Sequence, residues 1–485
     1  MSNEKEPDMT ETPAKPAQPD ATANAIADFG IDTTSMSTGE AIKDYFARMK
    51  DGQLGSIPAV LGVIVLAILF SALSGDFFTL RNIANLLAQG AGQTIIAMGI
   101  VFVLLLGEID LSAGTASGLC ASVMALHYVK TGNLLGSMGT GVFISFLVVL
   151  GIAVVLALLQ RIWAGAVIAA IGIVVIAIGV PVNAWLEMLI AICVGTAIGC
   201  ITGFLVSKIG MPSFVVTLAL FIVWQGVILQ FIGEGGTLPI STSDTLNAVA
   251  NGNLSVAGSW ILFIIAAGGY ALVALGQHFS RRKRGLVVQP TPIVLFKVGV
   301  VAVLAAVSTA LLSVNRSSSS LVVIQGVPFV VPIVLVLLVA GTYVLNRTRY
   351  GRHIYAVGGN KEAARRAGIN VAKLRTSVFV ISSTFAAIGA IVYSSKIGAV
   401  NPQSGGLNTL LFAVGAAVIG GTSLFGGKGR MIDAVIGGTV LAIVTNGLGL
   451  LQQSSAVVNI VTGLVLMLAA SVDALSRRRA AASAR

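Results

Sequence analysis

Long apolar runs separated by short polar segments most strongly limit what this chain can fold into. About fourteen such runs follow one another along 485 residues, and at roughly 17 to 25 residues each they can cross a hydrocarbon core about 30 Å thick as helices. Only 10% of the residues are charged, whereas soluble domains carry about 25%. We therefore predict an all-α fold, a polytopic transmembrane helical bundle of about 14 spans, and we exclude a soluble globular domain.

The starts of the runs give the expected order of the spans, with boundaries that can shift by several residues. The run from Leu407 to Gly420 is short, so it can be re-entrant or broken instead of spanning. The runs begin near Ile57, Ala91, Leu111, Met138, Ala164, Trp185, Ser213, Gly258, Ile293, Pro328, Ser377, Leu407, Ile432 and Ala456.

The distribution of Lys and Arg predicts the orientation of the chain. The net charge is +11, and we attribute it to the positive-inside rule, not to nucleic-acid binding, because the basic residues lie in short loops between apolar runs. Both termini are then cytoplasmic. The inner loops hold Arg161, Lys208, Arg281 to Arg284, the segment 346–376, Lys428, Arg430 and Arg477 to Arg479, and the outer loops hold only Arg81, Lys130, Arg316 and Lys396.

The domain organisation follows from these patterns. Residues 1–50 form a cytoplasmic tail that we expect to be disordered, with a short interfacial helix near 38–50 or, alternatively, a solvated linker there. Residues 51–476 form the transmembrane domain, and residues 477–485 form a basic cytoplasmic tail. Cys120, Cys193 and Cys200 all fall inside apolar runs. We interpret these cysteines as packing residues and predict no metal site.

One basic segment, residues 346–376, interrupts the apolar runs. It carries eight Lys or Arg residues against one acid, Glu362. Asn360 is a good helix cap, KEAARRA favours a helix, and Gly368 can end it in the left-handed conformation. We predict a short helix over 360–368 outside the membrane, where it is either a solvated face or a docking element. The residues outside this helix are mostly accounted for by positive-inside anchoring.

Two further motifs could carry chemistry. GEIDLSAG, residues 107–114, places Glu108 and Asp110 near a membrane boundary, where acids are costly unless they are solvated, paired or functional. Acid/base catalysis is the weaker interpretation because no nucleophile or His accompanies the pair, so we expect Asp110 to cap the following helix. TSLFGGKGR, residues 422–430, fails the phosphate-loop pattern and predicts a tight inner loop.

Glycines spaced four residues apart predict close helix packing. Gly195, Gly199 and Gly203 form one such ladder, and Gly114 with Gly118 forms another. Small residues at this spacing let two helix backbones approach each other within a membrane.

Together, GEIDLSAG, GRHIYAVGGNKEAARRAGI and AAVIGGTSLFGGKGR resemble the permease subunits of bacterial monosaccharide ABC importers, the ribose, galactose and xylose family. The resemblance runs from about Phe70 to the last span. It departs from the family pattern of about ten spans by extra runs near Ala164 and Ile293, and by Glu108 where the family usually has Gly. These departures look most like the xylose-type branch.

The resemblance implies a function for the short helix. In that family, the matching segment is the coupling helix that docks on the ATPase subunit. The resemblance assigns this docking role to Asn360, Lys361, Glu362, Ala363, Ala364, Arg365, Arg366 and Gly368.

The resemblance also implies partners and a location. The chain would be the non-enzymatic half of an importer in the bacterial inner membrane, a homodimer served by an ATPase that holds ATP and Mg and by an extracytoplasmic sugar-binding protein. It would carry xylose or a similar pentose or hexose. Weakly polar side chains would line the pathway, and the candidates are Ser112, Thr217, Gln225 and Asn446.

Two other classes of function stay open at this point. A stand-alone secondary transporter would need ionisable residues deep in the spans, and the candidates are few: Glu187, Asp433 and Asp473. A membrane enzyme would need a catalytic cluster, and the sequence shows no such cluster.

Overall fold

The computed structural model describes residues 37–40, 43, 56–286, 288–317 and 321–483. The tail predicted to be disordered and most of the helix predicted near 38–50 lie outside these residues. The described chain is almost entirely helical, with a single two-stranded sheet in which Leu238 pairs antiparallel with Val400.

The elements follow one another along the chain in this order. The first half contains α3 (Ile57–Leu73), α4 (Leu80–Leu105), α5 (Ala113–Val129), α6 (Leu134–Met138), α7 (Thr140–Leu159), α8 (Trp163–Ile178), α9 (Ala184–Phe204), η1 (Leu205–Ile209), α10 (Ser213–Ile232), β1 (Leu238–Pro239) and α11 (Asp244–Asn251). The second half contains α12 (Val256–Phe263), η2 (Ile264–Gly268), α13 (Gly269–Lys283), α14 (Thr291–Ser313), α15 (Val330–Arg347), α16 (Arg349–Gly359), α17 (Lys361–Arg366), α18 (Val371–Ile397), β2 (Ala399–Val400), α19 (Leu407–Ile419), α20 (Met431–Leu450) and α21 (Ser455–Ser483).

Every predicted apolar run coincides with a helix. Within the described ranges, nine helices are long and apolar enough to cross a membrane, and four more apolar helices are shorter. The short run for which a re-entrant or broken helix was an alternative to a span is α19, with 13 residues. The chain is therefore a polytopic helical membrane protein.

The start of α4 differs from the prediction. The helix begins at Leu80, well before the expected Ala91, because Thr79 accepts a hydrogen bond from the Asn82 amide at 3.3 Å and caps the helix. Asn82 is buried and exchanges side-chain hydrogen bonds of 2.8 and 2.9 Å with Asn446 in α20. The first turns of α4 are too polar to be recognised as part of an apolar run. They are nevertheless helical, and Asn82 in them packs against α20.

The described chain forms two compact units. The smaller one includes residues Ile265–Leu304, with α13 and the first part of α14. Within it, His278 Nε2 lies 3.0 Å from Thr291 Oγ1, and Lys297 donates to Gln289 Oε1 at 2.9 Å. The larger unit contains the remaining helices and all of the sites described below.

Helix α18 is the centre of the larger unit and packs against both α9 and α4. The predicted glycine ladder of α9 faces it directly. A Cβ atom at Gly199 would lie 2.5 Å from Val380 Cα, and one at Gly203 would lie 2.8 Å from Thr376 Cα. The expected close approach is confirmed, because the backbone of α18 occupies the space that any side chain would need.

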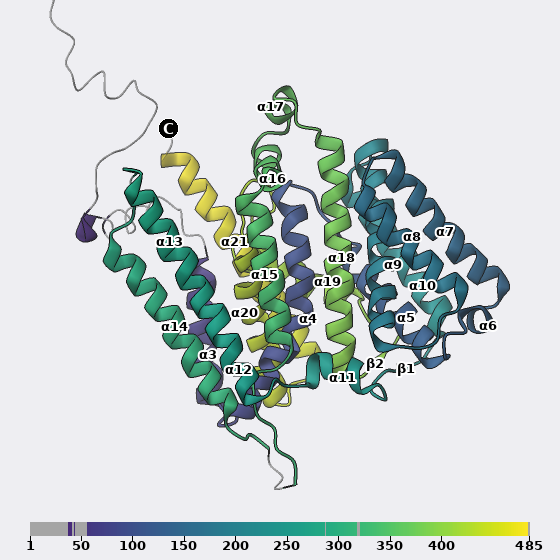
Figure 1. Cartoon of the computed structure of the whole chain (residues 1–485), viewed down its shortest axis with the longest axis horizontal. Coiled ribbons are helices and arrows are strands. Elements are labelled where there is room, and N and C mark those ends of the chain that lie inside the picture. The colour runs from purple at the N-terminus through teal and green to yellow at the C-terminus, as the bar shows by residue number, and fades with distance from the viewer. Residues whose placement is uncertain (1–36, 41–42, 44–55, 287, 318–320, 484–485) are drawn as a thin grey trace, which may run out of the picture. The chain divides into compact units, whose positions relative to one another are not determined.

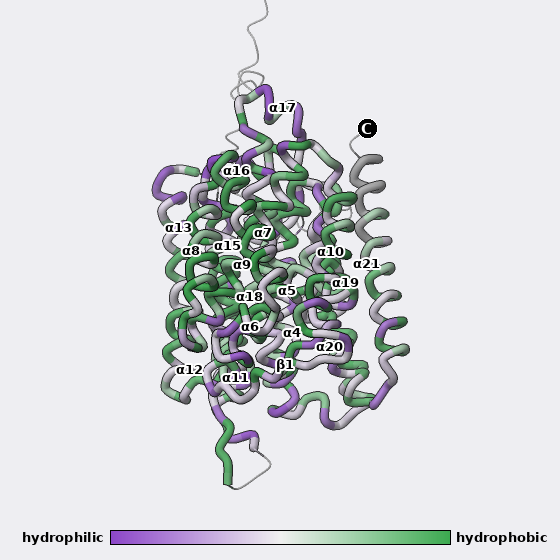
Figure 2. Tube along the Cα trace, turned by 90° about the vertical axis from the view of Figure 1, so that its right-hand side faces the viewer, coloured by the Kyte–Doolittle hydropathy of each residue, from purple (hydrophilic) through white to green (hydrophobic). Residues whose placement is uncertain are grey.

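The two ends of the larger unit have different character. Figure 1 shows α16 and α17 at one end of α4 and α18, with β1, β2 and α11 at the other end. Figure 2 shows that α17 is markedly hydrophilic and that it lies beyond the hydrophobic bodies of these helices. The basic segment of the sequence therefore forms a separate polar projection.

Candidate functional site

The polar projection is built around α17, the short helix predicted from its cap. Asn360 is in an extended conformation that ends α16, and its Oδ1 accepts a hydrogen bond from the Ala363 amide at 2.9 Å. Gly368 follows the helix with a φ of 83°, which favours glycine. The predicted helix, its cap and its stop are therefore confirmed.

Most of the residues assigned to docking face solvent. Arg365 and Glu362 form an exposed ion pair of 3.0 Å on the outer surface of α17. Ala364 is different, because it is 5% exposed and packs into the chain's own core. Ala364 therefore holds α17 in place, and the surface open to a partner consists of Asn360, Lys361, Glu362, Ala363, Arg365, Arg366 and Gly368.

Three motifs that are far apart in the sequence meet below this projection. Gly358, at the end of α16, packs directly on the carbonyl of Leu105 and beside the amide of Gly427. Gly427 donates to the same Leu105 carbonyl at 2.9 Å, and the Tyr355 hydroxyl donates to the carbonyl of Gly429 at 2.8 Å. We call this contact of the segments 105–112, 355–375 and 425–430 the junction.

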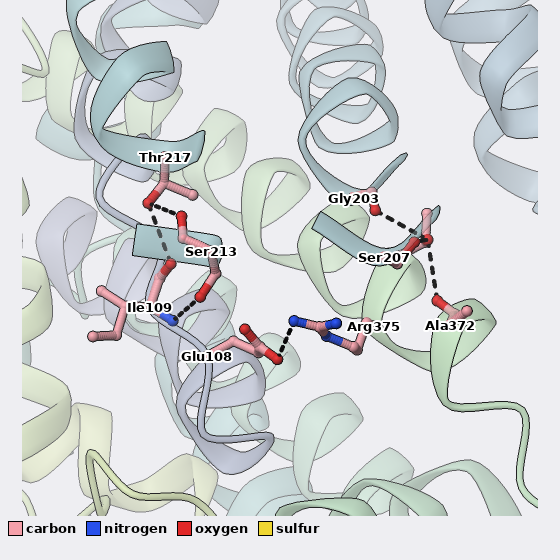
Figure 3. Close-up of polar contacts among 9 residues, drawn as sticks. Glu108, Ile109, Gly203, Ser207, Ser213, Thr217, Ala372 and Arg375 are labelled. Carbon is pink, nitrogen blue, oxygen red and sulfur yellow. Dashed lines mark hydrogen bonds and ion pairs between the residues drawn. The ribbon is translucent and has the colours of Figure 1, made fainter. Parts of the chain in front are cut away.

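An ion pair crosses the junction. Arg375 Nη2, in the first turns of α18, lies 2.6 Å from Glu108 Oε1, and Figure 3 shows the two side chains pointing toward each other. Both are largely buried, with 14% and 13% exposure. Arg375 therefore does more than anchor the loop at the membrane surface.

The residue after Glu108 fastens the same loop to α10. The Ile109 amide donates to Ser213 Oγ at 3.3 Å. The Ile109 carbonyl lies 3.3 Å from Thr217 Oγ1, whose hydrogen is shared with the nearer Ser213 carbonyl at 2.8 Å, as seen in Figure 3. Both partners lie in the first turns of α10. A shift of this loop would therefore be transmitted to α10.

Asp110 ties the loop to α5 and α18. Its Oδ1 accepts hydrogen bonds from the Ser112 amide at 3.1 Å and from the Ser112 hydroxyl at 2.7 Å, and its Oδ2 accepts one from Ser382 at 2.8 Å. The N-cap residue of α5 is Ser112. The prediction that Asp110 caps α5 is therefore corrected: Ser112 is the N-cap residue, and Asp110 holds Ser112 through these hydrogen bonds.

The half-buried Tyr350 of α16 strengthens the junction. The hydroxyls of Tyr350 and Ser377 lie 2.8 Å apart, which joins α16 to α18. Burial raises the pKa of the Tyr350 hydroxyl to about 12, against the smaller opposing effect of this hydrogen bond. Tyr350 therefore stays neutral near pH 7 and acts as a structural link.

The four candidate pathway residues are not brought together. Ser112 lies in the junction and Thr217 lies beside it in α10, and both are buried. Gln225 donates to the carbonyl of Pro402 at 2.7 Å, and Asn446 pairs with Asn82. One of the four is thus part of the junction, one contacts it, and the other two join separate pairs of segments.

One buried pair was missed from the sequence. His127 Nδ1, near the end of α5, lies 2.8 and 3.0 Å from the two carboxylate oxygens of Glu187 in the first turn of α9. Both side chains have 0% exposure. The sequence feature that could have indicated the pair is Glu187 at the edge of an apolar run, because a buried acid there requires a partner.

The ranges that the structure describes contain no group of three or more His, Cys, Asp or Glu side chains that could hold a metal ion. The carboxylates of the junction are instead paired with Arg375 and with serine hydroxyls. The geometry of the junction is that of a mechanical connection between helices.

Comparison with known proteins adds an independent result. Residues 82–470 match the family described as the branched-chain amino acid transport system / permease component. The chain is 30% identical to the xylose transport system permease protein XylH of Haemophilus influenzae over 433 residues, covering 89% of this chain and 99% of that protein. It is 30% identical to XylH of Escherichia coli, covering 90% and 95%.

A further relative is the ribose import permease protein RbsC of Escherichia coli, which is 29% identical and covers 86% of this chain and 92% of its own length. No solved structure matches the chain.

Proposed function

The chain belongs to the family of branched-chain amino acid transport system permease components, and from this premise we propose that it is the membrane-spanning subunit of an ABC importer that carries xylose, or a similar pentose or hexose, into the cytoplasm. The sugar is taken from the names of the relatives, which are xylose and ribose permeases matched over most of the chain.

The observation that carries the proposal is the position of α17. A six-residue capped helix projects from a bundle of membrane spans and presents both Arg365 and Arg366 to solvent. Such a helix is too short to be stable by itself, and it is supported by the buried Ala364 and by the junction. This rigid charged projection is suited to docking an ATPase subunit, which would hold ATP and Mg and drive the spans through α17.

The other parts of the proposed importer follow from this assignment. An extracytoplasmic sugar-binding protein would deliver the sugar to the end of the bundle that holds β1, β2 and α11. Two copies of the chain would enclose the pathway in the bacterial inner membrane. Ser112, Thr217, Gln225 and Asn446 remain the proposed pathway residues.

Docking is tested with a double substitution, Arg365→Glu with Arg366→Glu. We expect it to abolish copurification of the ATPase encoded beside this chain, because it replaces two positive charges on the exposed face of α17 by negative ones. The matched control is Arg347→Glu with Arg349→Glu, which makes the same change of charge at exposed positions outside α17 and should retain the ATPase. Normal copurification of the α17 variant would remove the docking assignment.

A stand-alone secondary transporter is the second candidate, and the buried His127–Glu187 pair at the ends of α5 and α9 favours it, because ionisable groups buried in membrane segments often mark ion or proton pathways. Asp433 does not add to this case, since Arg430 pairs with it at 3.0 Å at the start of α20. Sugar uptake into vesicles separates the two candidates. Uptake by the chain without ATPase or ATP would contradict the importer.

A further inference from the structure

The ion pair between Glu108 and Arg375 joins the two segments that the proposed function requires to move together. Arg375 belongs to the basic segment that carries α17, and Glu108 belongs to the loop that connects α4 with α5. The carboxylate and guanidinium atoms lie 2.6 Å apart across the junction. The inference drawn from this pair rests on the proposed function of α17.

On one side of the pair, α17 and the start of α18 form a single rigid piece. The Ile369 amide donates to the Ala364 carbonyl at 3.1 Å, and the Asn370 side chain caps α18 by accepting from the Lys373 amide at 2.9 Å. Ala364 and Leu374 are both buried in the same apolar cluster. A displacement of α17 would therefore displace Arg375.

On the other side, Glu108 lies between the end of α4 and the start of α10. Its amide donates to the Val103 carbonyl in α4 at 3.2 Å. The next residue, Ile109, is held from both its amide and its carbonyl by Ser213 and Thr217 of α10. A pull on the Glu108 carboxylate would therefore act on α4 and α10 together.

The pair differs from the other connection below α17. On the α16 side, Gly358 packs on the Leu105 carbonyl, and Tyr355 is linked to α4 through its hydrogen bond to the Gly429 carbonyl and the hydrogen bond from the Gly427 amide to Leu105. These are contacts between neutral groups. The ion pair resists separation, and its residual exposure lets water solvate the two charges when it opens. We propose that Glu108 and Arg375 form a tether, a positioning pair that transmits the movement of α17 to α4 and α10 during transport.

The experiment measures sugar uptake per ATP hydrolysed by the complete transporter in proteoliposomes, with ATPase subunit and binding protein present. In the Glu108→Gln variant, α17 is unchanged, so the ATPase should copurify normally. Uptake per ATP should fall by about tenfold, within the usual range of coupling between two sites. A pair with only a structural role would lower the yield of folded protein without changing this ratio.

Rescue and a matched control complete the test. Exchanging the charges by Glu108→Arg with Arg375→Glu should restore most of the uptake per ATP that Glu108→Gln loses. Glu108→Asp, which retains the charge on a shorter side chain, should give an intermediate uptake per ATP. Lys373→Gln removes one positive charge from an exposed position in the same helical turn and should leave the ratio unchanged.

The tether is overturned if Glu108→Gln transports as much sugar per ATP as the unmodified chain, or if the charge exchange restores nothing. If Glu108→Gln fails to reach the membrane, uptake per ATP is measured in the charge-exchanged chain instead. A ratio close to that of the unmodified chain then supports the tether, and a ratio about tenfold lower overturns it. Failure of the proposed function would appear in the unmodified chain itself, as uptake without ATP or as the absence of ATPase copurification.

Discussion

At each end of α5 a carboxylate pairs with a nitrogen-bearing side chain across two distant parts of the chain, and the two pairs differ in how much water reaches them. Before the helix begins, Glu108 pairs with Arg375 and both side chains retain 13 to 14% exposure. Near its end, His127 pairs with Glu187 and both have 0% exposure.

This difference indicates different tasks for the two ends. A fully buried pair is costly to break, because the group left behind has neither water nor a partner. A partly solvated pair can open at a much lower cost, since water replaces the lost partner. We interpret the dry end of α5 as a fixed anchor between α5 and α9, and the wetter end as the place where the helix bundle can be moved.

The largest expected effect is at the dry end. Glu187→Ala should lower the free energy of unfolding by about 3 to 5 kcal/mol, the usual cost of breaking a buried pair, because His127 Nδ1 loses its acceptor inside an apolar cluster. Unfolding in detergent with increasing dodecyl sulfate measures this. Glu187→Gln, which keeps an acceptor oxygen, is the control and should lose less. Equal losses in the two variants would contradict a polar anchor.

An intermediate loss of stability is expected at Asp110, the buried carboxylate that precedes α5. Ser382→Ala removes the hydroxyl that donates to Asp110 Oδ2 at 2.8 Å, and leaving a buried hydrogen-bonding group unsatisfied costs about 1 to 3 kcal/mol. Ser383→Ala on the same helix is the matched control, because the buried Ser383 hydroxyl has no hydrogen-bond partner among the described residues. The same unfolding titration should show a loss for Ser382→Ala alone, and similar values for both would show that the Asp110 contact adds no stability.

The smallest effect on stability is expected at the tether. Glu108→Ala should lower the free energy of unfolding by less than Glu187→Ala does, because Arg375 keeps 14% exposure and water can reach part of its guanidinium when its partner is removed. The comparison between the two ends would fail if Glu108→Ala destabilised the chain as much as Glu187→Ala does.

Several parts of the structure could be predicted because their physical cause is local. The apolar runs predicted the helices, since each run must satisfy its own backbone hydrogen bonds in a membrane. Asn360 and Gly368 predicted the two ends of α17, because a cap acts only within about one helical turn. The glycine spacing of α9 predicted a close helix contact, although it did not name α18 as the partner.

Other parts could not be predicted because their cause lies elsewhere in the chain. Arg375 was counted among the anchoring charges, and only the packing of α18 beside the loop after α4 showed its partner. His127 stood out in no motif, and 60 residues separate it from Glu187. The early start of α4 was hidden because Asn82 finds its partner in α20.

The sequence by itself determined that the chain is a helical membrane protein, where most of its helices lie and that one short charged helix projects from it, because hydropathy, caps and glycine spacing act over a few neighbouring residues. Only the tertiary structure decided which charges meet. A buried ion pair depends on two backbones being brought within a few ångströms by packing, and no local pattern of residues encodes that approach.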